Sequence, residues 1–456
     1  MKRQFIIAVI AASAVAMLLG VARVPRAAAV SFKATPALAV CSQPTDIAAG
    51  DFNGDGRLDL AVCCNGGLFG SVLLGDGKGG FGSRSDVPSV NYAHSLAVAD
   101  LDGDGKADLV TVGRDPDKAA ILLGNGVFGF ALAGTFECDP DPSCVAVAAV
   151  NRDRRPDLLV ASKGADSVGV MLGIGDGSFA AATDFATGSG PVSIAVGDLN
   201  RDGRLDLVSA DSLSNVVHVW LGDGTGGFGD RAVFSTGTNP QEVAIADLNR
   251  DGRADLVTAN DSFDNTVTVR LGDGAGGFAA RADYPTGPLP VAVAVGDFDG
   301  DRNIDLASAD SGADSVSVLL GAGSGGFQTA ASVFPTGDYP VGVAVADFNR
   351  DGKPDLATAD LDAGAVSWTL NVTPPRIRSL RPTRARAGAT VTIAGWGFGL
   401  RRGTSKVYIG SSAVTRFVSW SKGTIKVKVP NMPPGKKTVR VKTADGRSNA
   451  VSFRVM

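Results

Sequence analysis

The chain has 456 residues, more than the roughly 100–200 of one domain, so several units or a repeat array are expected. Hydrophobic residues make up 44% and there are 60 glycines, which argues against global disorder and indicates many tight turns; two histidines and five cysteines make histidine catalysis and cysteine-rich zinc sites poor expectations. The formal net charge of −4 hides a contrast between residues 30–373, with 21 basic and 46 acidic residues, and residues 374–456, with 18 basic and one acidic.

The first segment, residues 1–29, is predicted to be a secretory signal peptide. Lys2 and Arg3 precede an apolar run from Phe5 to about Val21, and small residues at 27–29 give a cleavage site. An uncleaved signal anchor is the alternative. No later run reaches transmembrane length. We therefore expect a secreted or extracytoplasmic protein, with a place at the cell surface as a variant, and no transmembrane segment after cleavage.

The cysteines would then lie in a compartment that permits disulfides. Cys138 and Cys144 bracket a short loop and are expected to pair. Cys41 is expected to pair with either Cys63 or Cys64, which leaves one thiol over.

Residues 30–373 contain one unit repeated seven times. An acidic loop of the form Asp-x-Asn/Asp-x-Asp-Gly-x-x-Asp-Leu recurs at steps of 49 or 50 residues and begins at 51, 100, 198, 247, 297 and 347, with a degraded copy at 149. Apolar runs flank each loop, and an alternating segment and a Gly-Gly-Phe-type turn follow, so each unit is predicted to form four strands. Seven such units favour a seven-bladed β-propeller.

The way the array closes can be predicted from one phenylalanine position. Phe81 lies 19 residues before the next acidic loop, and Phe32 has the same distance to the first loop. The seventh unit lacks the Gly-rich turn. We expect residues near Phe32 to supply the fourth strand of the last unit, which removes the free edges of a linear solenoid, the alternative arrangement.

The acidic loops are predicted to bind Ca²⁺. Positions 1, 3, 5 and 9 carry oxygen side chains, position 7 offers its carbonyl, and glycine at position 6 permits the sharp turn, as in the first part of an EF-hand loop. A solvated acidic turn is the alternative for any single copy. Five sites are complete: Asp51, Asn53, Asp55, Arg57 and Asp59; Asp100, Asp102, Asp104, Lys106 and Asp108; Asp198, Asn200, Asp202, Arg204 and Asp206; Asp247, Asn249, Asp251, Arg253 and Asp255; and Asp347, Asn349, Asp351, Lys353 and Asp355.

Two loops depart from this pattern. The sixth keeps its oxygens in Asp297, Asp299, Asp301, Asn303 and Asp305 but has Arg302 in place of glycine, so it is a sixth, less complete candidate. The third has Ala149 and Arg154 at two key positions, and we expect no metal there.

The loops, the Gly-Gly-Phe turns and the seven-fold count resemble the FG-GAP/VCBS-type propellers related to the head of integrin α-chains. This resemblance covers about residues 31–372. It implies a calcium-stiffened scaffold, often with an adhesive function.

Residues 374–456 begin at Pro374-Pro375 and contain four alternating segments, which predict a small immunoglobulin-like β-sandwich. The pattern of Pro382, Gly388, Gly395, Phe398 and Phe453 is similar to the IPT/TIG family. Some members bind DNA, but export makes nucleic acid an unexpected partner here. The basic surplus is expected either to meet an anionic surface or to dock onto the acidic repeats of the same chain.

For function, we expect a binding or adhesion protein that recognises an extracellular protein or glycan surface, and not an enzyme. His218 alternates with valines and is read as a surface strand residue, and His94 alone makes no active site. A carbohydrate-active lyase or hydrolase, or a purely structural matrix protein, is the alternative. The face opposite the acidic loops collects variable segments that include Tyr92, His94, Asn239 and Tyr339, and is the expected binding face.

Overall fold

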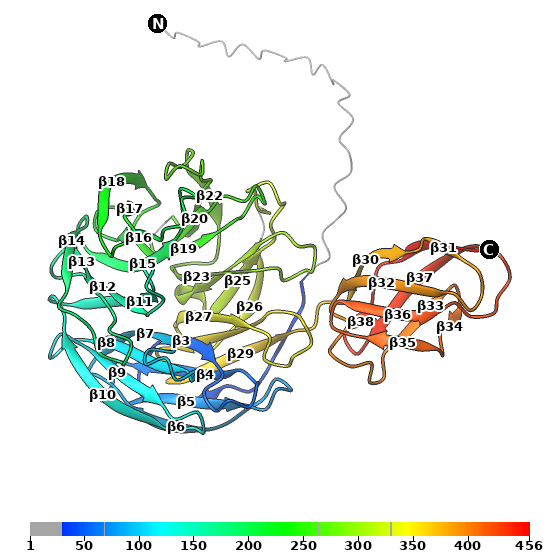
Figure 1. Cartoon of the computed structure of the whole chain (residues 1–456), viewed down its shortest axis with the longest axis horizontal. Coiled ribbons are helices and arrows are strands. Elements are labelled where there is room, and N and C mark those ends of the chain that lie inside the picture. Colours follow the sequence, from blue (N-terminus) through cyan, green and yellow to red (C-terminus); the bar gives the residue numbers. More distant parts are fainter. Residues whose placement is uncertain (1–29, 68, 263, 329–330) are drawn as a thin grey trace, which may run out of the picture.

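The computed structural model describes residues 30–456 except 68, 263, 329 and 330, so the expected signal peptide lies outside the described residues. The fold is all-β, with 53% of residues in strands and 1% in helix. The only helical element among the described residues is the short 3₁₀ helix η1 (Ser311–Ala313), and none is long and apolar enough to cross a membrane. Figure 1 shows a large rounded part, the repeat domain (residues 30–373), and a smaller C-terminal domain (residues 374–456).

The repeat domain contains seven successive antiparallel sheets, which we number one to seven. Their first strands are β3 (Pro44–Gly50), β7 (Ala93–Ala99), β11 (Pro142–Ala148), β15 (Pro191–Gly197), β19 (Pro240–Ala246), β23 (Pro290–Gly296) and β27 (Pro340–Ala346). Their second strands are β4 (Asp59–Cys64), β8 (Asp108–Gly113), β12 (Asp157–Ser162), β16 (Asp206–Asp211), β20 (Asp255–Asn260), β24 (Asp305–Asp310) and β28 (Asp355–Asp360).

The outer strands complete each sheet. The third strands are β5 (Phe69–Gly75), β9 (Lys118–Gly124), β13 (Ser167–Met171), β17 (Val216–Gly222), β21 (Thr266–Arg270), β25 (Ser315–Leu319) and β29 (Ala365–Asn371). The fourth strands of sheets one to six are β6 (Phe81–Pro88), β10 (Phe130–Glu137), β14 (Thr183–Ala186), β18 (Phe228–Ser235), β22 (Ala282–Pro285) and β26 (Ser332–Pro335).

The second strands are buried along their whole length, at all six positions in each of the seven sheets. Such a strand has no solvent face, so its sequence is a short continuous run of small and apolar residues rather than an alternating one. The sheets therefore pack on one another through both faces.

Edge-to-face aromatic pairs join neighbouring sheets. The phenylalanine that ends each Gly-rich turn packs against an aromatic ring of the preceding sheet. For example, the ring centroids of Phe228 and Phe185 lie 5.2 Å apart, as do those of Phe278 and Phe234. Between sheets six and seven this position is taken by Phe32, whose ring centroid lies 4.9 Å from that of Phe334. Phe32 thus performs the role that its spacing predicts.

The N-terminal residues complete sheet seven. Strands β1 (Phe32–Ala34) and β2 (Leu38–Ala39) both pair with β29, and Phe32 is in register with Asn371. Each first strand contacts the first strands of the sheets before and after it, and β27 contacts β3. The first strand of sheet seven therefore lies beside the first strand of sheet one (Figure 1).

The C-terminal domain contains two sheets around a separate core. One has the order β30 (Arg376–Arg381), β32 (Thr390–Trp396), β36 (Thr424–Lys428) and β35 (Phe417–Trp420). The other has the order β31 (Arg384–Ala385), β39 (Val451–Val455), β37 (Gly435–Thr443), β33 (Lys406–Ile409) and β34 (Ser412–Ala413), with β38 (Gly446–Arg447) paired to β37. Val391, Ile425 and Phe453 lie in the core between them.

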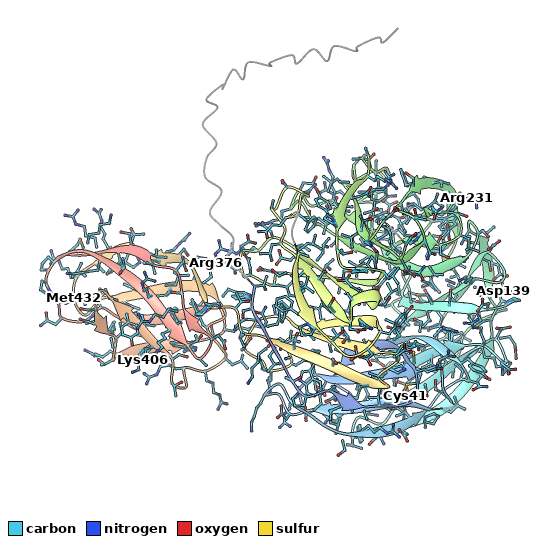
Figure 2. All side chains as sticks on the ribbon, turned by 180° about the vertical axis from the view of Figure 1, so that it is seen from behind. Cys41, Asp139, Arg231, Arg376, Lys406 and Met432 are labelled. Atoms are coloured by element: carbon cyan, nitrogen blue, oxygen red, sulfur yellow. A yellow bond between two sulfur atoms is a disulfide. The ribbon has the colours of Figure 1, made fainter. Side chains whose placement is uncertain are left out.

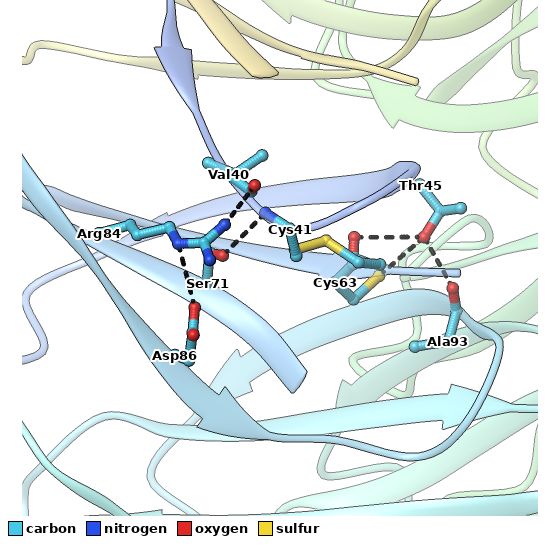
Figure 3. Close-up of a disulfide and its surroundings, with 9 residues drawn as sticks. Val40, Cys41, Thr45, Cys63, Ser71, Arg84, Asp86 and Ala93 are labelled. Atoms are coloured by element: carbon cyan, nitrogen blue, oxygen red, sulfur yellow. Dashed lines mark hydrogen bonds and ion pairs between the residues drawn. A yellow bond between two sulfur atoms is a disulfide. The ribbon is translucent and has the colours of Figure 1, made fainter. Parts of the chain in front are cut away.

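One of the expected disulfides forms and the other does not. Cys41 is bonded to Cys64, close to the hydrogen bond from the Cys41 amide to Ser71 (Figure 3). Cys138 and Cys144 are both free, so the predicted pairing is wrong. Cys138 follows the outermost strand of sheet two, whereas Cys144 lies in β11, the innermost strand of sheet three. The short segment between them crosses the sheet from its outer edge to the centre.

His218 is also not where the sequence indicated. It is 5% exposed, its Nδ1 atom is hydrogen-bonded to Asp211, and its ring centroid lies 5.6 Å from that of Trp220. Because both faces of sheet four are covered by neighbouring sheets, an alternating strand offers no surface position here.

Candidate functional site

The first acidic loop shows how all the loops are built. The amide of Gly56 donates to Asp51 Oδ2 at 2.8 Å, that of Asp55 donates to Asn53 Oδ1 at 3.0 Å, and that of Arg57 donates to Asp55 Oδ1 at 2.9 Å. Positions 4 and 6 are left-handed, with φ of 71° at Gly54 and 76° at Gly56. The backbone thereby folds the side chains at positions 1, 3 and 5 back over the loop.

The aspartate at position 9 ties each loop to the end of the third strand of its sheet. Asp59 is fully buried; its Oδ2 accepts the amide of Phe52 at 2.9 Å and its Oδ1 accepts the amide of Gly75 at 2.8 Å. Burial raises the pKa of Asp59, although both amide bonds oppose this effect. The same two bonds recur in all seven sheets, through Asp108, Asp157, Asp206, Asp255, Asp305 and Asp355.

The carboxylates converge most closely in loops two and six. Oxygen atoms of Asp100, Asp102 and Asp108 lie within 4.8 Å of one another, as do those of Asp297, Asp299 and Asp305. Asp100 Oδ1 is buried and has no hydrogen-bond partner among the described residues. A hard divalent cation fits such a set of oxygen donors.

Loop three lacks this arrangement. Position 1 is Ala149, so no carboxylate accepts the amide of Arg154, which nevertheless keeps a left-handed φ of 70°. Its position-9 residue, Asp157, accepts the amides of Val150 and Asn151 at 2.8 and 3.4 Å. The donor set of this loop does not fit a cation.

The second candidate site is the axial cavity, a space of about 310 Å³ lined by residues of the seven first strands. Each first strand lines it with two or three successive residues, of which the first two form two rings. The outer ring is Thr45, His94, Ser143, Val192, Gln241, Val291 and Val341, and the inner ring is Asp46, Ser95, Cys144, Ser193, Glu242, Ala292 and Gly342.

Two carboxyl groups stand in the inner ring. Asp46 Oδ2 accepts hydrogen bonds from Ser95 Oγ and the amide of Leu96, each at 3.0 Å, and burial raises the pKa of Asp46. Glu242 Oε2 accepts the amide of Val293 at 2.7 Å. Burial, together with the charge of Asp46, raises the pKa of Glu242 to about 8.

A second space of about 350 Å³, the mouth cavity, adjoins the axial cavity at its outer ring. Residues of sheets two to seven line it, among them Arg114, Lys163, Asp261 and Tyr339. Arg114 Nε lies 2.7 Å from His94 Nε2 and 3.0 Å from Asp141 Oδ1. Burial and the Arg114 charge lower the pKa of His94 to about 4, so this imidazole is neutral at pH 7 and accepts a hydrogen bond from Arg114.

Of the residues expected on the binding face, His94 and Tyr339 line the mouth cavity. Tyr92 and Asn239 adjoin it, because their carbonyls accept the amides of the lining residues Arg114 and Asp261. Tyr92, Asn239 and Tyr339 each precede the first strand of their sheet and are left-handed, with φ of 48°, 54° and 57°. Their counterparts Gln43, Asp141, Gly190 and Leu289 share this conformation. Hydrogen bonds from the preceding sheet hold these left-handed residues in place. The amide of Asn239 donates to Asn215 Oδ1 at 2.7 Å, and the amide of Tyr339 donates to Asp314 Oδ1 at 2.9 Å.

The sequence reading missed most polar residues of the two cavities. Asp46 and Glu242 lie two residues after Pro44 and Pro240, and Gln241 lies one residue after Pro240. This fixed offset from the start of each first strand could have indicated that these residues line one cavity. Residues at the same offset occupy equivalent positions, and the fold brings the equivalent positions of all seven strands together. Arg114 and Lys163 follow second strands and had no comparable marker.

Comparison with known families places both parts of the chain. The model of the FG-GAP-like repeat matches residues 51–111, 100–160, 150–209, 198–258, 247–308 and 297–358. The IPT/TIG domain model matches residues 375–455.

The curated relatives match only a small region. Cyclomaltodextrin glucanotransferase from Thermoanaerobacterium thermosulfurigenes is 44% identical over 75 residues, 16% of this chain and 10% of that enzyme. The enzyme from Bacillus sp. (strain 1011) is 39% identical over 93 residues, 20% of this chain and 13% of that enzyme. The chain thus spans about a tenth of these relatives, within the IPT/TIG part.

Solved structures share the fold. BBS1N, from its complex with ARL6DN, superposes with a TM-score of 0.54 at 14% identity and covers 74% of this chain and 96% of its own. A protein from Lactobacillus plantarum has a TM-score of 0.52 at 16% identity and covers 67% and 88%. A putative 6-phosphogluconolactonase from Bacteroides uniformis has a TM-score of 0.52 at 15% identity and covers 64% and 86%.

Proposed function

We propose that this chain, which belongs to the FG-GAP-like repeat family and carries an IPT/TIG domain, is a secreted, calcium-stabilised binding protein. Its target would be an extracellular protein or glycan surface. The architecture we propose is a seven-bladed β-propeller followed by an immunoglobulin-like sandwich. The contacts between successive first strands, including the contact of β27 with β3, and the pairing of β1 with β29 support the first part, and the two-sheet core of the C-terminal domain supports the second.

Calcium would be held by loops one, two, four, five and seven through their side chains at positions 1, 3, 5 and 9 and the carbonyl at position 7. The unpartnered Asp100 oxygen and the close carboxylates of loop two support this assignment. Bound Ca²⁺ would supply positive charge to a domain with 21 basic and 46 acidic residues. Backbone amides of each loop would orient its side-chain oxygens toward the ion. The face of the repeat domain opposite the acidic loops would then be free for recognition.

The single observation that carries the binding assignment is the mouth cavity. Six sheets contribute residues to it, and these residues combine aromatic rings, cations, carboxylates and an amide. Tyr92 is 45% exposed and Tyr339 is 37% exposed beside this polar set. Exposed aromatic rings next to hydrogen-bonding groups suit sugars or a peptide surface, and a rigid scaffold holds them in place.

The experiment is a glycan and cell-surface protein array probed with the full chain, with and without EDTA. A ligand found there is then tested against the triple variant Tyr92→Ala, His94→Ala and Tyr339→Ala. The matched control is Arg57→Ala, Arg204→Ala and Arg253→Ala on the opposite face, where the side chains are exposed and only the carbonyls are assigned to calcium. We expect loss of binding in the first variant alone. Equal binding by both variants would contradict the assignment, and turnover of an arrayed glycan would favour the carbohydrate-active alternative.

We propose a second binding surface on the basic C-terminal domain, which acts through charge. Many of its cations are exposed, including Arg381, Arg384, Arg386 and Lys436. We propose that these face an anionic surface through charge alone, which predicts binding that weakens as salt rises.

A further inference from the structure

The sixth acidic loop faces cations that come from the other domain. Arg378, in β30, donates from Nη2 to Asp297 Oδ2 at 3.1 Å and to the carbonyl of Gly300 at 2.8 Å. Arg376 Nη1 lies 3.5 Å from Asp299 Oδ2 and 4.0 Å from Asp301 Oδ2. Figure 2 shows Arg376 on the side of the C-terminal domain next to the repeat domain, with Lys406 and Met432 farther out.

Burial at this contact shows that the charges are withdrawn from solvent. Asp299 is 1% exposed, and its Oδ2 atom has no hydrogen-bond partner among the described residues. The Arg376 Nη1 atom opposite is equally buried and unpartnered, so the two groups are paired by charge. Asp297 Oδ1 is a third buried atom without a partner in the same contact.

The loop backbone is also shaped to receive the C-terminal domain. A Cβ atom on Gly300 would lie 2.3 Å from the Trp396 ring, so the indole packs directly on the backbone of this loop. Arg302 stands at position 6 with a left-handed φ of 78°, where the complete loops have glycine, and its amide still donates to Asp297 Oδ2 at 3.0 Å. The loop thus keeps its fold, and Arg302 adds a positive charge to those of Arg376 and Arg378.

The carboxylates of loops one, two, four and five have different ion-pair partners from those of loop six. Among the described residues, the ion pairs formed by their carboxylates are with the basic residue at position 7 of the same loop, for example Asp55 with Arg57 at 3.4 Å and Asp251 with Arg253 at 3.6 Å. In the part of the chain that the structure describes, no residue of the C-terminal domain forms an ion pair with these four loops.

We propose that the sixth loop is a docking socket for the C-terminal domain, in which the guanidinium groups of Arg376 and Arg378 take the place of a metal cation. Two guanidinium charges at 3.1–4.0 Å from the carboxylates compensate the loop and repel a divalent ion from it. Metal binding and domain docking then exclude each other at this loop. The metal half of this inference rests on the proposed function, whereas the docking half does not.

The experiment compares the full chain with a double variant, Arg376→Gln and Arg378→Gln. The matched control is Arg381→Gln with Arg384→Gln, two exposed arginines of the same domain that form no ion pair with the described residues of the repeat domain. Small-angle X-ray scattering measures whether the domains stay together, and equilibrium dialysis with ⁴⁵Ca²⁺ measures bound metal per chain. We expect the double variant to have a larger radius of gyration and about one more bound Ca²⁺ than the parent and the control.

A further substitution assigns the additional ion. Asp299→Asn should remove the extra Ca²⁺ from the double variant and should leave the metal content of the parent unchanged. Loss of one Ca²⁺ from the parent on Asp299→Asn would overturn the inference, as would a double variant with unchanged scattering and metal content. If no protein in the set binds Ca²⁺, the calcium assignment of the proposed function fails, and scattering alone decides the socket: an expanded double variant supports it and a compact one refutes it.

Discussion

The ammonium group of Lys353, in the seventh acidic loop, donates a hydrogen bond to Asp445, the one acidic residue among residues 374–456. Lys353 is fully buried and also donates to the carbonyl of Asn371 at 2.9 Å. Its Nζ atom lies 5.8 Å from the centre of the Trp396 ring. A buried cation and a unique carboxylate therefore join the two domains beside the sixth loop.

The first prediction concerns this pair. Asp445→Asn removes one partner and leaves the Lys353 charge buried with only Asp351, 3.3 Å away, to compensate it. Because Asp445 is partly exposed, we expect a loss of about 2–3 kcal/mol in the free energy of unfolding, less than for a fully buried pair. Urea unfolding measures it. Asp362→Asn, at an exposed aspartate, is the control, and an equal effect of both substitutions would contradict the role of the pair.

The second prediction concerns the N-terminal strands. Deletion of residues 30–40 removes β1 and β2 from sheet seven, takes Phe32 away from Phe334 and exposes the edge of β29. We expect a broader calorimetric transition and aggregation on heating, relative to a chain that begins at residue 30. A truncated protein that melts like this control would show that the pairing does not matter for stability.

The sequence predicted the repeat and its register because both depend on spacing. Phe32 could be assigned to the last sheet since its distance to the first loop equals that of Phe81 to the second. The position-9 aspartates were identified for their oxygens, but their two backbone hydrogen bonds were not, because the amide of Gly75 comes within reach of Asp59 only when the sheet has formed.

Other features required the three-dimensional arrangement. His218 was placed on the surface because alternation assumes one solvent face, and sheet four has none. Cys63 and Cys64 are adjacent in a strand and point to opposite faces, so spacing could not choose between them as the partner of Cys41. Arg376 and Arg378 looked like any other cations of a basic domain until the structure brought them to Asp299 and Asp297.

The third prediction concerns the disulfide. The Cys41–Cys64 bond has a sequence separation of 23 residues, and a loop of this size restricts the unfolded chain by an amount worth about 3 kcal/mol. Cys41→Ser should lower the free energy of unfolding by about this amount under oxidising conditions and should match the parent in a reducing buffer. Cys138→Ser, at a cysteine without a bond, is the control. Equal stability of the two variants in oxidising buffer would contradict this prediction.

The fourth prediction concerns calcium and follows from the proposed function. Millimolar Ca²⁺ should stabilise the chain against EDTA by about 1–2 kcal/mol for each occupied loop, given affinities of roughly 10⁻⁴–10⁻³ M for extracellular modules. Asp100→Asn should reduce the rise in melting temperature, whereas Asp153→Asn in loop three should leave it unchanged. A melting temperature that does not respond to Ca²⁺, or that responds through Asp153, would refute the assignment of metal to these loops.

The last prediction concerns the pH dependence that Glu242 gives to the fold. Its pKa in the folded protein is about 8 because it is buried beside Asp46, above the usual value of 4.5. Below pH 4.5 the carboxyl is protonated in both states and contributes nothing. Between pH 4.5 and 8 the unfolded chain releases this proton while the folded chain keeps it, so stability falls as pH rises, and above pH 8 the penalty is constant.

Glu242→Gln removes this penalty and keeps a carbonyl oxygen that can accept the amide of Val293. The variant should match the parent near pH 4.5 and exceed its free energy of unfolding by about 1–2 kcal/mol at pH 8, a value reduced for the partial exposure of the group to the axial cavity. Guanidinium unfolding of both proteins at each pH measures the difference, which cancels the titration of the acidic loops. A difference that is constant with pH would show that folding does not shift the pKa of Glu242, and a difference that shrinks towards pH 8 would reverse the sign argued here.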